Sequence, residues 1–256
     1  MLSSSQVKHI HSLKQKKFRE INRQFLAEGA KLVTEILEGS YPIHAVYAIH
    51  EWLIHNDPIL LSKQIPFTEI SEAEMERITA LSSPSQVLAI LEIPETTVLP
   101  LGINDLVLVL DDIKDPGNLG TIIRIADWFG INSIICSENT VDLYNPKVIQ
   151  ATMGSFVRVN VGYFNIPGFL SSIDPSIKIY GTFKEGENIY SEKLDSRGII
   201  VIGSESFGIS AEVDKKITHR ISIPSFSSDT DKNHAESLNA SIATAIVCSE
   251  FRRRKG

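Results

Sequence analysis

The chain has 256 residues, of which 43% are hydrophobic and 22% are charged, as in ordinary folded globular proteins. This length allows one large domain or two smaller ones, and the composition excludes extensive disorder and fibrous repeats. No apolar run reaches the roughly 18 residues of a membrane-spanning helix, and the first residues lack the apolar core of a secretory signal. The two cysteines, Cys136 and Cys248, form no CxxC pair. We therefore expect a cytoplasmic protein without a disulfide framework or a metal site.

Charge is unevenly distributed along the chain, although the net charge is only −6. Residues 1–31 contain seven Lys or Arg residues against two Glu residues, and residues 252–255 read Arg-Arg-Arg-Lys. The remaining sequence is therefore strongly acidic. Segregated basic segments are typical of a surface that faces phosphate groups, but a solvated amphipathic helix and a basic tail give the same pattern. Charge alone does not decide between the two.

The first half of the chain alternates helix and strand patterns. In chain order we expect a helix over 3–23, a strand over 24–27, a helix over 30–37, a strand over 43–49, a helix over 71–81 and a strand over 86–91. The helix over 71–81 begins with Ser71 as N-cap and has Glu74 at the capping-box position. The stretch 93–100 contains two prolines and no helical period, so it reads as a linker.

The second half begins with a continuous apolar run over 106–110. A run without polar alternation is typical of a strand buried on both faces of a parallel sheet. Similar strands are expected at 133–136, 178–182, 199–202 and 220–223, with helical segments between them. Strand–helix alternation predicts right-handed crossovers and a mainly parallel sheet. We therefore expect two α/β domains, which cover residues 1–97 and 104–256.

Polar residues follow three of these strands, at the sheet edge where doubly wound proteins bind ligands. The three segments are Asn118-x-Gly-x-x-x-Arg124, then Gly203-x-Glu205-x-x-Gly208, then Ile223-Pro224 followed by Ser237-Leu238-Asn239. Each has a plain structural explanation when it is taken singly. Arg124 could pair with Asp127 on a helix surface, the glycine-bounded loop could be an ordinary turn, and Ser237 could cap a helix. The glycine fingerprints of dinucleotide and P-loop sites are missing, which counts against an unrelated nucleotide-binding enzyme.

In this order the three segments resemble the three motifs of the SpoU/TrmH family, the RNA 2′-O-ribose methyltransferases of the SPOUT class. Residues 25–36 and 83–89 are similar to parts of the ribosomal-protein-L30e-like domain that many members carry. The resemblance implies an α/β fold with a SPOUT-type parallel sheet and a C-terminal trefoil knot, preceded by a smaller L30e-like α/β domain. It also implies a homodimer, and S-adenosyl-L-methionine as methyl donor.

The resemblance assigns roles by motif position. The catalytic positions are Arg124, Asn118, Glu205, Ser237 and Asn239, and the cofactor positions are Gly203, Ile223 and Leu238. Thr182, which lies at the end of an expected strand, is added to the cofactor residues. A guanidinium group stays protonated at neutral pH, so we expect Arg124 to clamp phosphate and the developing oxyanion, although a base role stays open. Glu205 is expected to fix geometry. The loop from Ser225 to His234 is longer than is usual in the family, which puts cofactor affinity in doubt, and His234 is interpreted as a solvent-exposed bystander.

The basic N-terminal helix indicates folded RNA as the substrate, with phosphate contacts from Lys14, Lys16, Lys17, Arg19 and Arg23. Family members with the extra domain mostly modify large-subunit ribosomal RNA, so the resemblance favours that substrate over transfer RNA. We therefore predict methyl transfer from S-adenosylmethionine to a ribose 2′-hydroxyl of structured RNA. The alternative is a catalytically silent RNA- or ribosome-binding protein of the same fold, which the altered loop favours.

Overall fold

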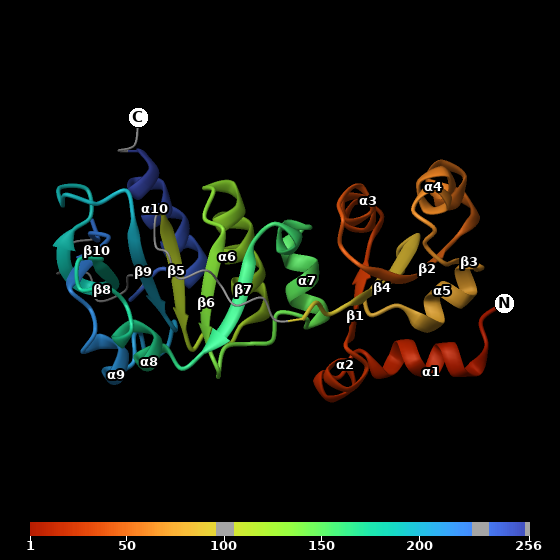
Figure 1. Cartoon of the computed structure of the whole chain (residues 1–256), viewed down its shortest axis with the longest axis horizontal. Helices are drawn as coiled ribbons and strands as arrows, with labels where there is room; N and C mark the ends of the chain where they lie inside the picture. The colour runs from red at the N-terminus through yellow and green to blue at the C-terminus, as the bar shows by residue number, and fades with distance from the viewer. Residues whose placement is uncertain (96–104, 227–235, 254–256) are drawn as a thin grey trace. The chain divides into compact units, whose positions relative to one another are not determined.

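The computed structural model describes residues 1–95, 105–226 and 236–253, which divide into two compact units (Figure 1). The first unit contains Met1–Thr97 together with Asp142–Val157, and the second contains the rest of the chain. The chain therefore returns to the first unit from the middle of its second half, which sequence reasoning did not anticipate. The expected linker over 93–100 lies mostly outside the described residues.

The first unit is built on a four-stranded sheet. Its elements are α1 (Ser4–Ser12), α2 (Lys16–Asn22), β1 (Gln24–Glu28), α3 (Ala30–Glu38), β2 (Ile43–Ala48), α4 (His50–Ser62), β3 (Phe67–Glu69), α5 (Glu72–Ile78), β4 (Val87–Glu92), α7 (Pro146–Thr152) and the 3-10 helix η1 (Ser155–Val157). The strand order is β1-β4-β2-β3, in which only β2 and β3 are parallel. Val87 and Ala89 of β4 belong to one apolar cluster, and Leu88 and Ile90 to another. Both faces of this sheet are therefore buried.

The helix expected over 3–23 is interrupted, and Arg19 explains why. Arg19 Nη1 donates hydrogen bonds to the carbonyl oxygens of Leu13 and Lys14, both at 3.0 Å. These carbonyls lie between α1 and α2, and in an unbroken helix they would accept from the backbone four residues later. The helix expected from residue 71 is confirmed as α5, with the capping box of Ser71 and Glu74 in place.

The second unit is built on a six-stranded sheet. Its elements are β5 (Leu106–Asp111), α6 (Pro116–Trp128), β6 (Ser133–Ser137), β7 (Asn160–Phe164), α8 (Ile166–Ser171), β8 (Ile179–Asn188), β9 (Gly198–Gly203), α9 (Ala211–Asp214), β10 (His219–Ser222) and α10 (Ala240–Arg253). The strands are parallel throughout, in the order β10-β8-β9-β5-β6-β7, which confirms the predicted parallel sheet (Figure 1). From the neighbours β5 and β9 the chain continues in opposite directions, to β6 and to β10. Their carboxyl ends therefore form the topological switch point, where ligands bind in such sheets.

The C-terminal trefoil knot stays a prediction, because the connection from β10 to α10 runs through residues 227–235, outside the described part of the chain. None of the described helices is long and apolar enough to span a membrane.

Cys136 in β6 and Cys248 in α10 are buried and unpaired. Burial raises the pKa of the Cys136 thiol above its ordinary range and that of the Cys248 thiol to about 12, so both stay protonated at neutral pH.

Candidate functional site

Three polar residues, one from each of the three segments, form a hydrogen-bonded cluster at the switch point of the parallel sheet. Asn118 Nδ2 donates to Glu205 Oε1 at 2.9 Å. Asn239 Nδ2 lies 2.6 Å from the same Oε1 and 2.9 Å from Asn118 Oδ1. The backbone N–H of Ala240 also donates to Glu205 Oε1, at 3.2 Å. One carboxylate oxygen therefore joins segments that are far apart in the sequence.

Helix caps position the two asparagines. Asp115 is the N-cap of α6, and its side chain accepts from the backbone N–H of Asn118 at 2.8 Å. Asn239 caps α10, because its Oδ1 accepts from the backbone N–H groups of Ser241 at 3.0 Å and Ile242 at 3.3 Å. The residue that caps this helix is therefore Asn239, and not Ser237, which was the cap considered from the sequence. Each asparagine is held by the first turn of its own helix.

A tight loop from Gly203 to Gly208 presents Glu205 to this cluster. Ser204 and Gly208 exchange two backbone hydrogen bonds, at 3.0 and 2.8 Å. A Cβ atom on Gly203 would lie 2.2 Å from the carbonyl carbon of Gly208, and Gly208 has a φ of +68°. Both glycines are therefore required by the loop backbone. Gly203, an expected cofactor contact, does not belong to the described residues that line the cavity beside the cluster.

That cavity has a volume of about 600 Å³, within the range of cofactor pockets. Thr182, Ile223 and Leu238, three of the four expected cofactor residues, line it, and so does Ser237 of the expected catalytic set. Its apolar wall includes Phe183, Ile189, Ile221, Pro224, Ala243 and Val247. Because Leu238 directly precedes Asn239, this cavity adjoins the polar cluster. The structure thus brings the predicted cofactor residues to one place.

Two charged residues of this cavity, Lys184 and Glu236, were missed by sequence reasoning. Lys184 lies two positions after Thr182 in β8, and residues two apart in a strand share a face. Glu236 directly precedes Ser237. Strand periodicity and adjacency to the third segment were therefore the signals that could have found them.

Arg124 does not belong to the polar cluster. It lies on α6 six residues after Asn118, about 9 Å along the helix axis, and it is exposed. Asp127, its plain structural partner, is bound instead by Arg158, whose Nη2 lies 2.8 Å from Asp127 Oδ2. Within the described part of the chain Arg124 has no hydrogen bond or ion pair. Its guanidinium group is therefore available to an anionic ligand.

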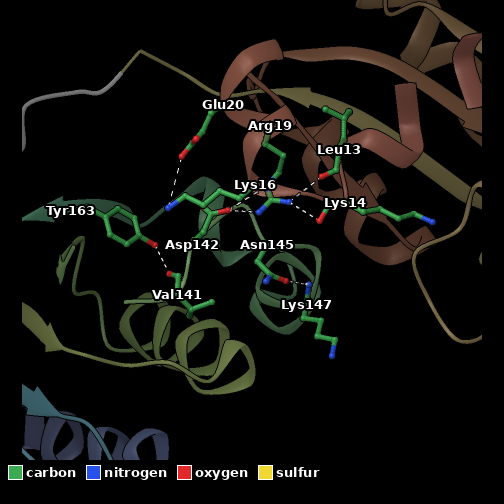
Figure 2. Close-up of polar contacts among 10 residues, drawn as sticks. All are labelled: Leu13, Lys14, Lys16, Arg19, Glu20, Val141, Asp142, Asn145, Lys147 and Tyr163. Atoms are coloured by element: carbon green, nitrogen blue, oxygen red, sulfur yellow. Dashed lines mark hydrogen bonds and ion pairs between the residues drawn. The ribbon is translucent and has the colours of Figure 1, made fainter. Parts of the chain in front are cut away.

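The structure corrects the expectation that Arg19 contacts RNA. Arg19 is only 3% exposed, and its Nη2 lies 2.6 Å from Asp142 Oδ2 (Figure 2). Its Nη1 is occupied by the carbonyl oxygens between α1 and α2, as Figure 2 also shows. A buried guanidinium whose donors are engaged on both sides cannot reach a phosphate. Arg19 instead fixes the α1–α2 break to the returning segment 142–157.

The other four residues expected to contact RNA differ in how far their side chains are engaged by the rest of the protein. Lys14 Nζ donates to the carbonyl oxygen of Thr79 at 2.7 Å, and partial burial lowers the pKa of Lys14. Arg23 is exposed, although its Nη2 donates to a carbonyl of the segment after β4 at 2.7 Å. Lys16 and Lys17 are exposed. The last two are the cations best placed to meet a phosphate group.

Several sequence expectations lie outside the described residues, among them His234 and most of the Ser225–His234 loop.

Part of the basic C-terminal segment is engaged within the second unit, because Arg252 Nε donates to the carbonyl oxygen of Phe129 at 2.7 Å and Nη1 lies 2.9 Å from Asp105 Oδ1. Over residues 1–95, 105–226 and 236–253, no group of three Asp, Glu, His or Cys residues is arranged to hold a metal ion.

Comparisons with known proteins agree with this geometry. The chain matches the SpoU rRNA Methylase family over residues 105–249 and the MRM3-like substrate binding domain over residues 4–89. It is 30% identical to the 23S rRNA (guanosine(2553)-2′-O)-methyltransferase RlmP of Bacillus subtilis, over 97% of this chain and 96% of that protein. A solved TrmH-family structure from Porphyromonas gingivalis is similar with a TM-score of 0.85 and 34% identity, over 99% of both chains. An AdoMet-bound rRNA methyltransferase from Sinorhizobium meliloti gives a TM-score of 0.84 and 28% identity, over 99% of this chain and 97% of that one.

Proposed function

The chain belongs to the SpoU rRNA methylase family and is an S-adenosylmethionine-dependent RNA 2′-O-methyltransferase, and we propose that its substrate is large-subunit ribosomal RNA. The observation that carries the proposal is the cluster of Asn118, Glu205 and Asn239 beside the 600 Å³ cavity. The Bacillus subtilis relative acts on 23S rRNA, which supports the choice of RNA. We place the reaction in the cytoplasm, where thiols such as Cys136 and Cys248 stay reduced.

The residues around the cavity fit S-adenosylmethionine. The apolar wall suits the adenine ring, and Thr182, Ile223 and Leu238 are the residues we assign to holding the donor. Lys184 and Glu236 carry opposite charges, which suit the carboxylate and the ammonium group of its amino-acid part. When bound, the donor supplies an electrophilic methyl group on a sulfonium sulfur.

Glu205 is proposed to act by position and not as the base. Its Oε1 accepts from Asn118, Asn239 and the backbone of Ala240, and these three hydrogen bonds hold the carboxylate in place. The carboxylate instead fixes the two amide side chains. With their orientation set, the amides can direct hydrogen bonds to the ribose that presents its 2′-hydroxyl.

Arg124 is proposed to bind a phosphate of the RNA and the oxygen that attacks the methyl group. The 2′-hydroxyl must lose its proton as it attacks, and negative charge develops on the oxygen. A guanidinium group stabilises that charge and offers paired N–H donors to a phosphate. Its exposure and its lack of a partner among the described residues support this role.

The exposed lysines of α2 are proposed to guide the RNA. Lys16 and Lys17 are exposed in the unit that matches a substrate binding domain. Because phosphate contacts release counterions, replacing both by Gln is expected to reduce the salt slope of RNA binding by about 2.

We also propose that the chain works as a homodimer. Trp128 of α6 is 85% exposed and Ile242 of α10 is 53% exposed. The two helices pack against each other (Figure 1). Asn239 bonds to Asn118 at one end of this helix pair and Arg252 bonds to Phe129 at the other, so Ile242 and Trp128 lie toward opposite ends of it. A second copy that packs along the helix pair would cover both side chains. Arg124 lies one helical turn before Trp128, so a second copy that covers Trp128 would bring this guanidinium to the subunit boundary.

The proposed function is tested by methyl transfer from labelled S-adenosylmethionine to RNA from cells that lack this gene. Label is expected in large-subunit ribosomal RNA, at a linkage that resists alkali because the 2′-oxygen is methylated. Label confined to transfer RNA would overturn the proposed substrate. Label in no RNA fraction, with cofactor binding intact, would favour the catalytically silent alternative.

A further inference from the structure

A small cavity adjoins the contact between Asn118 and Glu205, and a second cavity shares part of its lining. One, of about 180 Å³, is lined by residues 112–115, Asn118 and residues 204–207. The other, of about 370 Å³, extends across the carboxyl ends of β5, β6 and β7 to the N-terminus of α8. Both are lined by Asp112, Ser204 and Phe207. The two cavities therefore meet at these three residues, and none of the three lines the cofactor cavity.

Phe207 is the most exposed member of this set. It lies near the tip of the Gly203–Gly208 loop with 87% of its surface exposed, and its backbone N–H donates to Ser204 Oγ at 3.2 Å. The loop is closed by the two hydrogen bonds between Ser204 and Gly208, so the ring is carried by a defined backbone. Exposed aromatic rings beside a groove are the surface on which unstacked RNA bases pack.

Asp112 places a carboxylate at the junction of the two cavities. Its backbone is left-handed, with a φ of +64°, which is uncommon outside glycine. The N–H of Asp112 donates to Ser137 Oγ at 2.9 Å and so holds this conformation. Asp112 Oδ1 is buried and is paired with Lys114 Nζ at 2.6 Å, whereas 35% of the Asp112 side chain stays exposed. The carboxylate can therefore accept a hydrogen bond through its other oxygen, Oδ2, which has no hydrogen bond among the described residues.

The charge around the cavities decides which part of a nucleotide fits them. Besides Asp112, the larger cavity is lined by Asp111, Glu138 and Glu212, and the smaller by Asp115, Glu205 and Lys114. An excess of carboxylates repels a phosphate group. The same carboxylates accept hydrogen bonds from the N–H groups on the edge of a base. Acceptors of this kind beside the exposed ring of Phe207 fit the edge and the face of a base.

We propose that the two cavities bind the target nucleotide of the RNA after its base has left the stack. Phe207 stacks on the base, Asp112 accepts a hydrogen bond from an N–H group on its edge, and the ribose lies toward Asn118 and Glu205. The inference rests on the proposed function, because that function defines the RNA that supplies the nucleotide. It makes Phe207 and Asp112 specificity residues, in addition to the motif residues.

The kinetic test uses Phe207→Ala and ribosomal RNA from cells that lack this gene. Because stacking on one aromatic ring is worth a few kcal/mol, we expect kcat/KM for the RNA to fall by about 10- to 100-fold. Phe207→Tyr keeps the ring and is expected to restore most of it. Affinity for S-adenosylhomocysteine is expected to stay unchanged in both variants. Leu61→Ala, which removes a side chain that is 64% exposed on α4, is the matched control.

The binding test needs no methylation. In Phe207→Trp, the added indole is expected to be quenched saturably by nucleosides, which carry the base and the ribose without a phosphate, relative to the unmodified chain. Asp112→Asn in the Phe207→Trp background is expected to weaken that binding. If the unmodified chain methylates RNA and Phe207→Ala matches it, the inference is wrong while the proposed function stands. If the unmodified chain methylates no RNA, the proposed function fails, and the titration decides the inference by itself: saturable quenching supports it, and its absence overturns it.

Discussion

Glu205 Oε1 and Asn239 Nδ2 lie 2.6 Å apart, and the other end of the same amide caps α10 through the N–H groups of Ser241 and Ile242. A single side chain therefore connects the glycine-bounded loop to the start of the last helix. Leu238, which lines the cofactor cavity, directly precedes Asn239. The polar cluster and the cofactor cavity are consequently coupled through the backbone of two consecutive residues.

Substitutions at Glu205 separate a positioning role from a base role. Glu205→Gln keeps an acceptor oxygen for Asn118, Asn239 and Ala240, so we expect kcat to fall by less than about 10-fold, the scale of one weakened hydrogen bond. Glu205→Ala removes the acceptor that three donors share and is expected to lower kcat by about 100-fold or more, and to weaken cofactor binding. The measurement is single-turnover methyl transfer over a range of pH. A Gln variant as inactive as the Ala variant would show that Glu205 takes the proton.

Arg124 is expected to act on the RNA and not on the cofactor, because it does not line the cofactor cavity. In Arg124→Ala, loss of charge stabilisation at the attacking oxygen is expected to lower kcat by about 100- to 1000-fold. Calorimetric affinity for S-adenosylhomocysteine should match that of the unmodified chain. Arg124→Lys, which keeps the charge without the paired donors, should recover part of the rate. Methylation at the unmodified rate in Arg124→Ala would contradict the assignment.

The features predicted from the sequence were those set by local pattern or by motif order. The apolar run 106–110 predicted the central parallel strand, and Ser71 with Glu74 predicted a helix start. No single one of the three polar segments indicated a site, but their order along the chain did. It predicted that Asn118, Glu205 and Asn239 lie together, as their hydrogen bonds show.

The features that could not be predicted from the sequence depend on which helix and sheet surfaces pack against each other. The return of residues 142–157 to the first unit packs α7 against β1 and brings Tyr144 within 4.6 Å of Phe25 between ring centroids. Periodicity reports that a helix has an apolar face but not which sheet covers it. For the same reason a basic stretch does not reveal that Arg19 is buried, because its partner, Asp142, lies 123 positions away.

The buried pair of Arg19 and Asp142 is expected to contribute to stability. Asp142→Ala leaves a guanidinium that is 3% exposed without its counter-charge, which costs about 3–5 kcal/mol of unfolding free energy. Lys16→Ala is the control, since the exposed pair of Lys16 and Glu20, 3.8 Å apart, contributes less than about 1 kcal/mol. Urea unfolding of both variants measures the difference. Equal unfolding free energies would mean that the buried pair is replaceable by water or by neighbouring groups.

Lys184 offers the sharpest test of how the cofactor cavity is used. If its ammonium group binds the carboxylate of the donor's amino-acid part, Lys184→Met should lower the affinity for S-adenosylhomocysteine by about 10-fold, the scale of one charge-assisted hydrogen bond. The affinity for 5′-methylthioadenosine, which lacks the amino-acid part, should not change. Lys193→Met, also in the second unit but absent from the cavity lining, is the matched control. An equal loss of affinity for both ligands would mean that Lys184 shapes the cavity wall and does not bind the carboxylate. No loss for either ligand would mean that Lys184 does not contact the cofactor.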